Sequence, residues 1–154
     1  MLALVFQIGS DRLALDVRRI REVVPRVPLQ TLARSPSWLA GAFVYRGQVV
    51  PVIDLYRLAG DGDCPEHLSS RIILVPYPSH DDGRLLGLLA SDVADLQEVD
   101  ADASTGTRWH EEDKPDFGSA LAESTRVLRL VDLERLLPES MHGRLPSLTR
   151  RESP

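Results

Sequence analysis

An internal repeat constrains this chain more than any other feature of its sequence. The segment VIDLYRLAG at residues 52–60 returns as LVDLERLLP at residues 130–138, an offset of 78 positions. The segment DVRRIREV at residues 16–23 returns as DVADLQEV at residues 92–99, at an offset of 76. Landmarks that recur in the same order at nearly constant spacing indicate a tandem duplication. We therefore expect two copies of one small structural unit.

The first copy begins with a pattern typical of a β-hairpin. Residues 2–8 and 12–17 are rich in apolar side chains, and they flank a loop of small and polar residues at positions 9–11. Residues 20–28 follow as an extended segment with two prolines. Because proline cannot donate a hydrogen bond to a neighbouring strand, this segment is predicted to lie at the edge of a sheet.

A second hairpin is predicted over residues 42–53. Its strands are rich in β-branched and aromatic residues, and Arg46 and Gly47 form its tip, where Gly47 can take a positive φ. Asp54 is a suitable N-cap for the short helical turn that follows, and Gly60 is a suitable residue to end that turn.

The second copy repeats this order after a polar, turn-rich junction at residues 61–70. The sequence predicts a single domain over residues 1–138, with one β subdomain over about 1–66 and a second over about 67–138. A loosely held tail is expected over residues 139–154. The predicted strands of the second copy are residues 71–77, 85–89, 94–99, 117–122 and 127–131.

The closely spaced short strands predict an all-β fold of two small barrels in tandem with short helical turns. Closing a sheet into a barrel removes most of its exposed edges. With 43% hydrophobic residues the chain can build a core, but neither copy alone has much apolar surface to bury. We expect the two copies to pack together, at about 25 cal/mol for each Å² of apolar surface removed from water.

Bulk composition argues against several classes of partner. The net charge is −5, so there is no overall positive field to attract the phosphates of a nucleic acid. The apolar run at residues 1–8 is too short to insert into a membrane and lacks the basic leader of an export signal. The single cysteine, Cys64, cannot form an internal disulfide, which favours a reducing, cytoplasmic location.

Catalytic signatures are scarce. The sequence has no phosphate-binding glycine loop, no zinc-binding HExxH helix and no GxSxG nucleophile turn. We predict no catalytic residue, no metal site and no cofactor, and an enzyme built on the acidic loop around His110 and Glu111 is the weakest alternative. No two of the histidines stand at the spacing of metal ligands, and they lie in separate polar segments as His67, His80, His110 and His142.

The two copies differ at the tip of the hairpin. At an offset of 77, Arg46 and Gly47 correspond to Glu123 and Ser124, so the second copy lacks both the cation and the glycine. A guanidinium group offers a planar fork of donors to a carboxylate, and the nearest predicted acceptor is Glu22. An exposed ion pair contributes only about 0 to 1 kcal/mol to stability. We interpret Arg46 as a recognition residue, and a solvated tip without a function is the alternative.

This hairpin carries a family resemblance. The pattern G-x-x-x-x-R-G-x-V-V-P-V-I-D-L at residues 41–55, with IREVV before it and VDLERLL after it, resembles the CheW-like domain of bacterial chemosensory systems. The likeness extends over about residues 4–137. The positions expected to maintain the structure of the motif are Gly47, Pro51, Asp54 and Asp132.

The resemblance implies two SH3-like, five-stranded β subdomains and a non-catalytic adaptor. Such an adaptor couples a chemoreceptor to a CheA-type histidine kinase in a signal-transduction pathway. The resemblance implies that the regulatory domain of the kinase contacts Ile20, Glu22, Val23 and Arg46. It also implies that the cytoplasmic helical hairpin of the receptor lies near the apolar groove between the subdomains and near Gly41, Val44 and Tyr45.

Two departures from the family pattern concern the receptor side. Val44 stands where the family commonly has asparagine, and Tyr45 replaces a usual aliphatic residue. They point to an adaptor for a specialised pathway not devoted to motility. The alternative that the residues leave open is a small β-barrel module that binds a ligand, or a peptide along the edge at residues 20–28.

Overall fold

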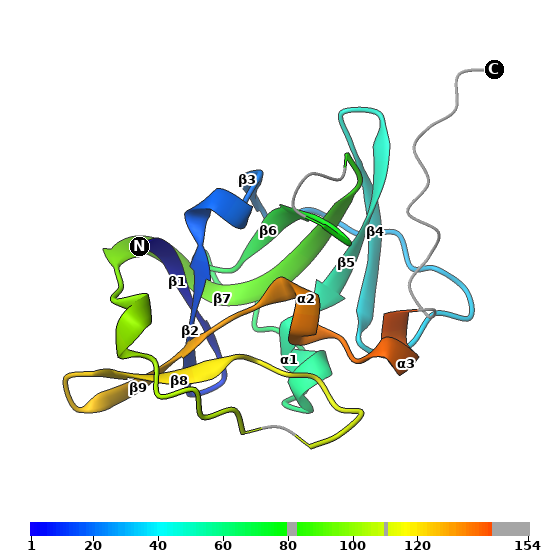
Figure 1. Ribbon diagram of the computed structural model, residues 1–154. Helices are drawn as coiled ribbons and strands as arrows, with labels where there is room; N and C mark the ends of the chain where they lie inside the picture. The colour runs from blue at the N-terminus through cyan, green and yellow to red at the C-terminus, as the bar shows by residue number, and fades with distance from the viewer. Residues whose placement is uncertain (80–82, 110, 143–154) are drawn as a thin grey trace.

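The computed structural model describes residues 1–79, 83–109 and 111–142, which form short strands with few helices (Figure 1). The strands are β1 (Leu2–Ile8), β2 (Asp11–Asp16), β3 (Glu22–Pro25), β4 (Leu39–Tyr45), β5 (Gln48–Asp54), β6 (Arg71–Pro76), β7 (Leu85–Glu98), β8 (Ser119–Glu123) and β9 (Arg126–Leu130). The helical segments are η1 (Val17–Arg19), α1 (Leu55–Ala59), η2 (Ala101–Ala103), α2 (Leu133–Leu136) and α3 (Glu139–His142). The predicted all-β class is confirmed.

The strands form two SH3-like subdomains that share β7. In the first, which we call the Arg46 subdomain, β3 pairs with β6, β6 pairs with the start of β7, and β5 pairs with both β4 and β7. In the second, the Ser124 subdomain, the end of β7 pairs with β1, and the order continues through β2, β9 and β8. Each subdomain contains one parallel pair, β5 with β7 or β2 with β9, so the two repeat one topology.

The division predicted at residue 66 is wrong, because the two copies exchange strands. β1 and β2 belong to the first copy but pair with β7 and β9 of the second. In return, β6 and the start of β7 complete the subdomain that contains β3, β4 and β5. The exchange joins apolar side chains of both copies in one core, which suits two units with little apolar surface each. The largest fully buried side chains are Phe6, Ile8, Leu13, Leu15, Ile53, Leu55, Ile72, Ile73, Leu74, Leu86, Leu88 and Leu89.

The two strands predicted over residues 85–89 and 94–99 are one continuous strand, β7. Asp92 takes a φ of 49° within it, and the pairing with β1 shifts register between Val5 and Gln7. Such a bulge bends a strand without ending it. β7 therefore leaves the Arg46 subdomain and enters the other, and Figure 1 shows it crossing between them.

The caps predicted for the first helical turn are formed, and the second copy repeats the N-cap. The carboxylate of Asp54 accepts a hydrogen bond from the backbone N–H of Tyr56 at 2.9 Å, and Gly60 ends α1 with a φ of 82°. The carboxylate of Asp132 accepts the N–H of Glu134 at 3.1 Å and begins α2. The repeated Asp-Leu step thus marks the same strand-to-helix turn twice.

The prediction of a loose tail is wrong for residues 139–142. These residues form α3, in which the hydroxyl of Ser140 donates a hydrogen bond of 2.6 Å to Asp113 and Met141 packs against the core. The hydrogen bond to Asp113, which lies in the long loop before β8, and the packing of Met141 on the core hold this turn in place. The remainder of the predicted tail, residues 143–154, lies outside the described residues.

Candidate functional site

Arg46 and Gly47 form the two-residue tip of the β4–β5 hairpin, as predicted. Tyr45 and Gln48 pair on either side of it, and both tip residues have positive φ, 49° and 78°. This is the backbone pattern of a type I′ turn. A left-handed conformation costs a non-glycine residue about 1–2 kcal/mol, yet an arginine occupies the first position. The side chain of Arg46 is 78% exposed, so burial does not offset this cost.

Strand β3 brings Glu22 beside the hairpin. The hydroxyl of Tyr45 donates a hydrogen bond to the carboxylate of Glu22. Nη2 of Arg46 lies 3.8 Å from Oε2 of Glu22, and its guanidinium carbon lies 5.1 Å from the centroid of the Tyr45 ring. The predicted pair of Arg46 and Glu22 is therefore formed, but its long distance and exposure leave guanidinium N–H groups facing solvent. The central place of Tyr45 in this cluster was not predicted.

An exposed apolar pair lies on the same hairpin. Val44 and Val49 face each other across β4 and β5 and are 69% and 59% exposed. Directly opposed residues project on one face of a sheet, so they form a continuous apolar surface. Val23 adds a third exposed apolar side chain on β3. Val49 was missed from the sequence, although a two-residue tip after Tyr45 fixes its register opposite Val44.

The remaining predicted residues, Ile20, Gly41 and Pro51, are buried or partly buried. Ile20 follows η1 and is packed partly against the core. Gly41 is buried with a φ of 147°, and a Cβ there would lie 2.6 Å from the carbonyl oxygen of Gln30. Gly41 thus positions the hairpin and offers no side chain to a partner. Pro51 is buried opposite Ala42, just before β5 begins to pair with β7, a place that fits its missing N–H.

The second hairpin shows that the predicted alignment of the tips is shifted by one residue. Glu123 and Arg126 pair at its base, and Ser124 and Thr125 form its tip. Arg46 therefore corresponds to Ser124, at an offset of 78 and not 77. Ser124 has a φ of 57°, so the second copy also places a non-glycine residue in the left-handed region. The cation and the glycine are still absent from this tip.

The base of the second hairpin holds a closed polar network. Glu123, the counterpart of Tyr45, accepts hydrogen bonds from Arg12 at 2.6 Å and from Gln97 at 2.8 Å. The side chains of Arg12 and Glu123 are only 15% and 29% exposed. Their hydrogen bonds are therefore directed within the subdomain, whereas the charge of Arg46 is directed outward.

The described residues also bear on the other predictions. Burial raises the pKa of the Cys64 thiol, which keeps it protonated and a poor nucleophile. In residues 1–79, 83–109 and 111–142, no three acidic, histidine or cysteine side chains are grouped as a metal site requires. None of the helices in these ranges is long and apolar enough to span a membrane. His80 and His110 lie outside the described residues.

Comparisons with known proteins cover both subdomains. A model of the CheW-like domain matches residues 2–141. The probable chemotaxis protein CheW of Rhizobium etli is 27% identical over 139 residues, which cover 89% of this chain and 87% of that protein. The protein FrzA of Myxococcus xanthus is 32% identical over 95 residues, 59% of each chain. The crystal structure of the scaffolding protein TtCheW from Thermoanaerobacter tengcongensis superposes with a TM-score of 0.71 and 24% identity, over 88% of this chain and 86% of that one.

Proposed function

Since the chain belongs to the family of CheW-like domains, we infer that it is a non-catalytic adaptor that couples a chemoreceptor to a CheA-type histidine kinase. The observation that carries this function is the family match over residues 2–141, which includes both subdomains. An adaptor needs no bond chemistry. It can control a kinase by binding one of its conformations more tightly, with a coupling of typically about 1–3 kcal/mol. The contacts with the kinase and with the receptor would both be made in the cytoplasm, and we therefore propose that the protein is located there.

The surface proposed for the regulatory domain of the kinase lies on β3 and the hairpin tip. Arg46 supplies an exposed cation on a rigid turn, and Glu22 supplies an acid held in place by Tyr45. Val23, the next residue of β3, is an exposed apolar side chain. Opposite charges next to apolar side chains suit a specific, exchangeable protein interface. The residues of this proposed kinase surface are Ile20, Glu22, Val23 and Arg46.

The surface proposed for the helical hairpin of the receptor centres on Val44. Val44 and its cross-strand neighbour Val49 present an apolar face of the kind that packs on an amphipathic helix. Gly41 supports this contact indirectly, through the position of β4. Tyr45 is bonded to Glu22 and precedes Arg46, so it links the two proposed surfaces. The departure from the family asparagine falls on Val44, which supports a receptor outside the motility pathway.

A reconstituted assay tests the adaptor function. Receptor in membrane vesicles and a CheA-type kinase are combined with or without the chain, and phosphate incorporation into the kinase is measured. We expect the chain to be required for the receptor to control the kinase. If the receptor changed the rate of kinase phosphorylation equally when the chain was left out, the adaptor function would be contradicted.

Charge reversal at the hairpin tip tests the kinase surface separately. Arg46→Glu places a second acid beside Glu22 and should weaken kinase binding about tenfold or more, measured by calorimetry. The matched control is Ser124→Glu, which adds a carboxylate at the equivalent tip of the second hairpin and should leave the affinity unchanged. Equal affinities for wild type and Arg46→Glu would exclude Arg46 from the interface while leaving the adaptor function to the first assay.

A further inference from the structure

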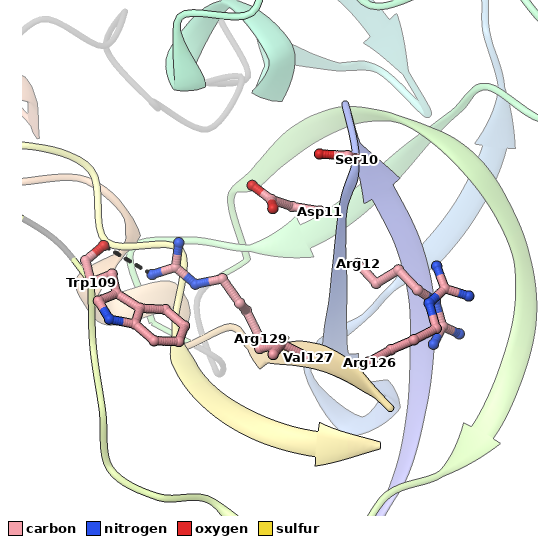
Figure 2. A pocket seen from close by; sticks show the side chains of 7 residues that line it. All are labelled: Ser10, Asp11, Arg12, Trp109, Arg126, Val127 and Arg129. Carbon is pink, nitrogen blue, oxygen red and sulfur yellow. Dashed lines mark hydrogen bonds between the residues drawn. The ribbon is translucent and has the colours of Figure 1, made fainter. Parts of the chain in front are cut away.

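A second site lies in the Ser124 subdomain. A pocket of about 280 Å³ opens between the β1–β2 loop, β9 and the segment that precedes β8. Figure 2 shows Trp109 and Arg129 at one end of it and the guanidinium groups of Arg12 and Arg126 at the other. The volume is at the lower end of the range for small-molecule pockets, about 300–1,000 Å³. Three arginines in so small a space indicate a pocket for an anion.

The charges of these arginines are only partly compensated. Arg12 is paired with Glu123 at 2.6 Å, but the side chain of Arg126 makes no hydrogen bond or ion pair with any described residue. Nη2 of Arg129 donates to the backbone carbonyl oxygens of Trp109 at 3.2 Å and Gly118 at 3.0 Å. Carbonyl groups satisfy its donors without neutralising its charge. Positive charge therefore collects here in a chain whose net charge is −5.

Burial adds to this imbalance at Arg129. It lowers the pKa of the guanidinium from its ordinary value, and the charge of Arg108 acts in the same direction, while Asp11 and Asp116 oppose it. A lowered arginine pKa means that the charged form is incompletely solvated. A negatively charged ligand in the pocket, with an aromatic ring stacked beside this guanidinium, would restore favourable interactions to the cation.

The other walls suit a ligand that is more than a simple anion. The indole of Trp109 is 61% exposed at the pocket wall, which leaves its face open to stack on a planar ring. Ser10 lies on the β1–β2 loop and Asp11 begins β2, so a hydroxyl and a carboxylate there can bond the hydroxyl or amine groups of a ligand. Asp11 would repel bare phosphate, so the lining favours a molecule with both acidic and donor groups.

We propose that this pocket binds a small phosphorylated molecule with a planar ring, of the mononucleotide class. The phosphate lies at the Arg126 end, the ring stacks on Trp109 beside Arg129, and a ligand hydroxyl donates to Asp11. This site is independent of the hairpin surface and does not rest on the adaptor function.

Fluorescence provides a direct test, because the chain has two tryptophans and Trp38 is buried in the core. The protein is titrated with adenosine, guanosine and cytidine monophosphates, and separately with adenosine and with inorganic phosphate. A ring stacked on Trp109 should quench its emission, and at least one nucleotide should bind tenfold or more tightly than adenosine or phosphate. The Trp109→Phe variant should lose the quenching.

Calorimetry with variants assigns the phosphate contact. Arg126→Ala should weaken binding of that nucleotide about tenfold or more, the usual loss for a hydrogen bond to a charged group. Arg18→Ala, which removes an exposed arginine of η1, is the matched control and should have no effect. Inorganic phosphate binding as tightly as every nucleotide, adenosine binding as tightly as its phosphate, or an unchanged affinity in Arg126→Ala would each overturn the proposal, as would the absence of binding by all probes.

Discussion

The two hairpins, β4–β5 and β8–β9, occupy equivalent places in their subdomains but use their polar residues differently. In the Ser124 subdomain, Glu123 is bound by Arg12 and Gln97, and the network is closed. In the Arg46 subdomain, the equivalent position is Tyr45, and the neighbouring cation is directed to solvent. Figure 1 shows the two hairpins at opposite ends of the molecule. A duplicated scaffold has thus locked one hairpin internally and left the other available to a partner.

The largest expected effect concerns a backbone feature that both hairpins share. A Cβ at Gly118 would lie 2.1 Å from the carbonyl oxygen of Leu130, and one at Gly41 would lie 2.6 Å from that of Gln30, both at positive φ. Gly118→Ala should lower the free energy of unfolding by about 3 kcal/mol, and Gly41→Ala by somewhat less. Equilibrium urea unfolding measures both. A loss below 0.5 kcal/mol at either glycine would show that the hairpins do not share this constraint.

The second prediction separates the locked hairpin from the free one. Arg12→Ala leaves the half-buried carboxylate of Glu123 with Gln97 as its remaining side-chain partner. The free energy of unfolding should fall by about 2 kcal/mol, as when a partly buried charge loses its partner. Arg18→Ala breaks the exposed pair with Asp16 and should cost less than about 0.5 kcal/mol in the same urea titration. Equal losses in the two variants would contradict the closed network.

A smaller effect is expected for the contact between β3 and the first hairpin. Tyr45→Phe removes the hydroxyl that donates to Glu22 and should lower the free energy of unfolding by about 1 kcal/mol. The same change in a Glu22→Gln background should cost less, because the acceptor is no longer charged. Chemical denaturation of the wild type, the two single variants and the double variant measures the coupling energy between the two side chains. A coupling energy of zero would mean that this hydrogen bond does not stabilise the contact between β3 and the hairpin.

The contacts of the two short helices α1 and α2 are expected to differ in how their contribution to stability depends on pH. In α2, hydrogen bonds from Arg19 lower the pKa of Glu134 from its ordinary 4.5 to about 2, while Asp132, bonded to Glu134, has its pKa raised. A depressed folded pKa stabilises the protein above pH 4.5, and this contribution is lost as the pH falls towards 2. Arg19→Ala should therefore reduce stability at neutral pH and approach wild type near pH 2. Thermal unfolding over this range tests it; a constant difference would contradict the assignment.

The equivalent position in α1 serves as the internal control. Tyr56, 78 residues before Glu134, makes a buried hydrogen bond of 2.6 Å to the hydroxyl of Ser91. This bond joins two hydroxyl groups and involves no carboxylate, so Tyr56→Phe should cost the same free energy at pH 3 and at pH 7. A strong pH dependence of that cost would break the proposed contrast between the helices.

The smallest effect is expected at the exposed tip itself. Arg46→Ser gives the first hairpin the residue that the second has at the same place. Because the guanidinium is exposed and its ion pair is long, the free energy of unfolding should change by less than about 0.5 kcal/mol. Differential scanning calorimetry checks this. A loss of 2 kcal/mol or more would mean that Arg46 serves folding and not recognition.

Local features were predictable because they depend on neighbours in the sequence. Gly47 at a positive φ, the cap from Asp54 to Tyr56 and the stop at Gly60 each need only a few adjacent residues. The pairing of Glu22 with Arg46 was also predictable, since the repeat placed an acid on β3 and a cation on the hairpin of one unit.

Long-range features were not predictable by the same reasoning. A repeat shows which strands are equivalent, but the continuous apolar runs of β1 and β2 suit pairing with either copy. The continuity of β7 depends on Asp92 taking a positive φ, which its residue type does not require. In the candidate site, the roles of Tyr45 and Val49 follow from the register of β4 and β5, and a one-residue error in aligning the tips concealed the counterpart of Arg46.

Because of the exchange of strands between the copies, the strands that are synthesised first are among the last to find all their partners in the sheet. β1 and β2 leave the ribosome first, yet their neighbours in the sheet, β7 and β9, end at residues 98 and 130. The Arg46 subdomain can close once β7 has emerged, whereas the apolar strands made earliest must wait for almost the whole domain. The apolar side chains of the β1–β2 hairpin therefore stay exposed to solvent until translation has reached the end of the domain.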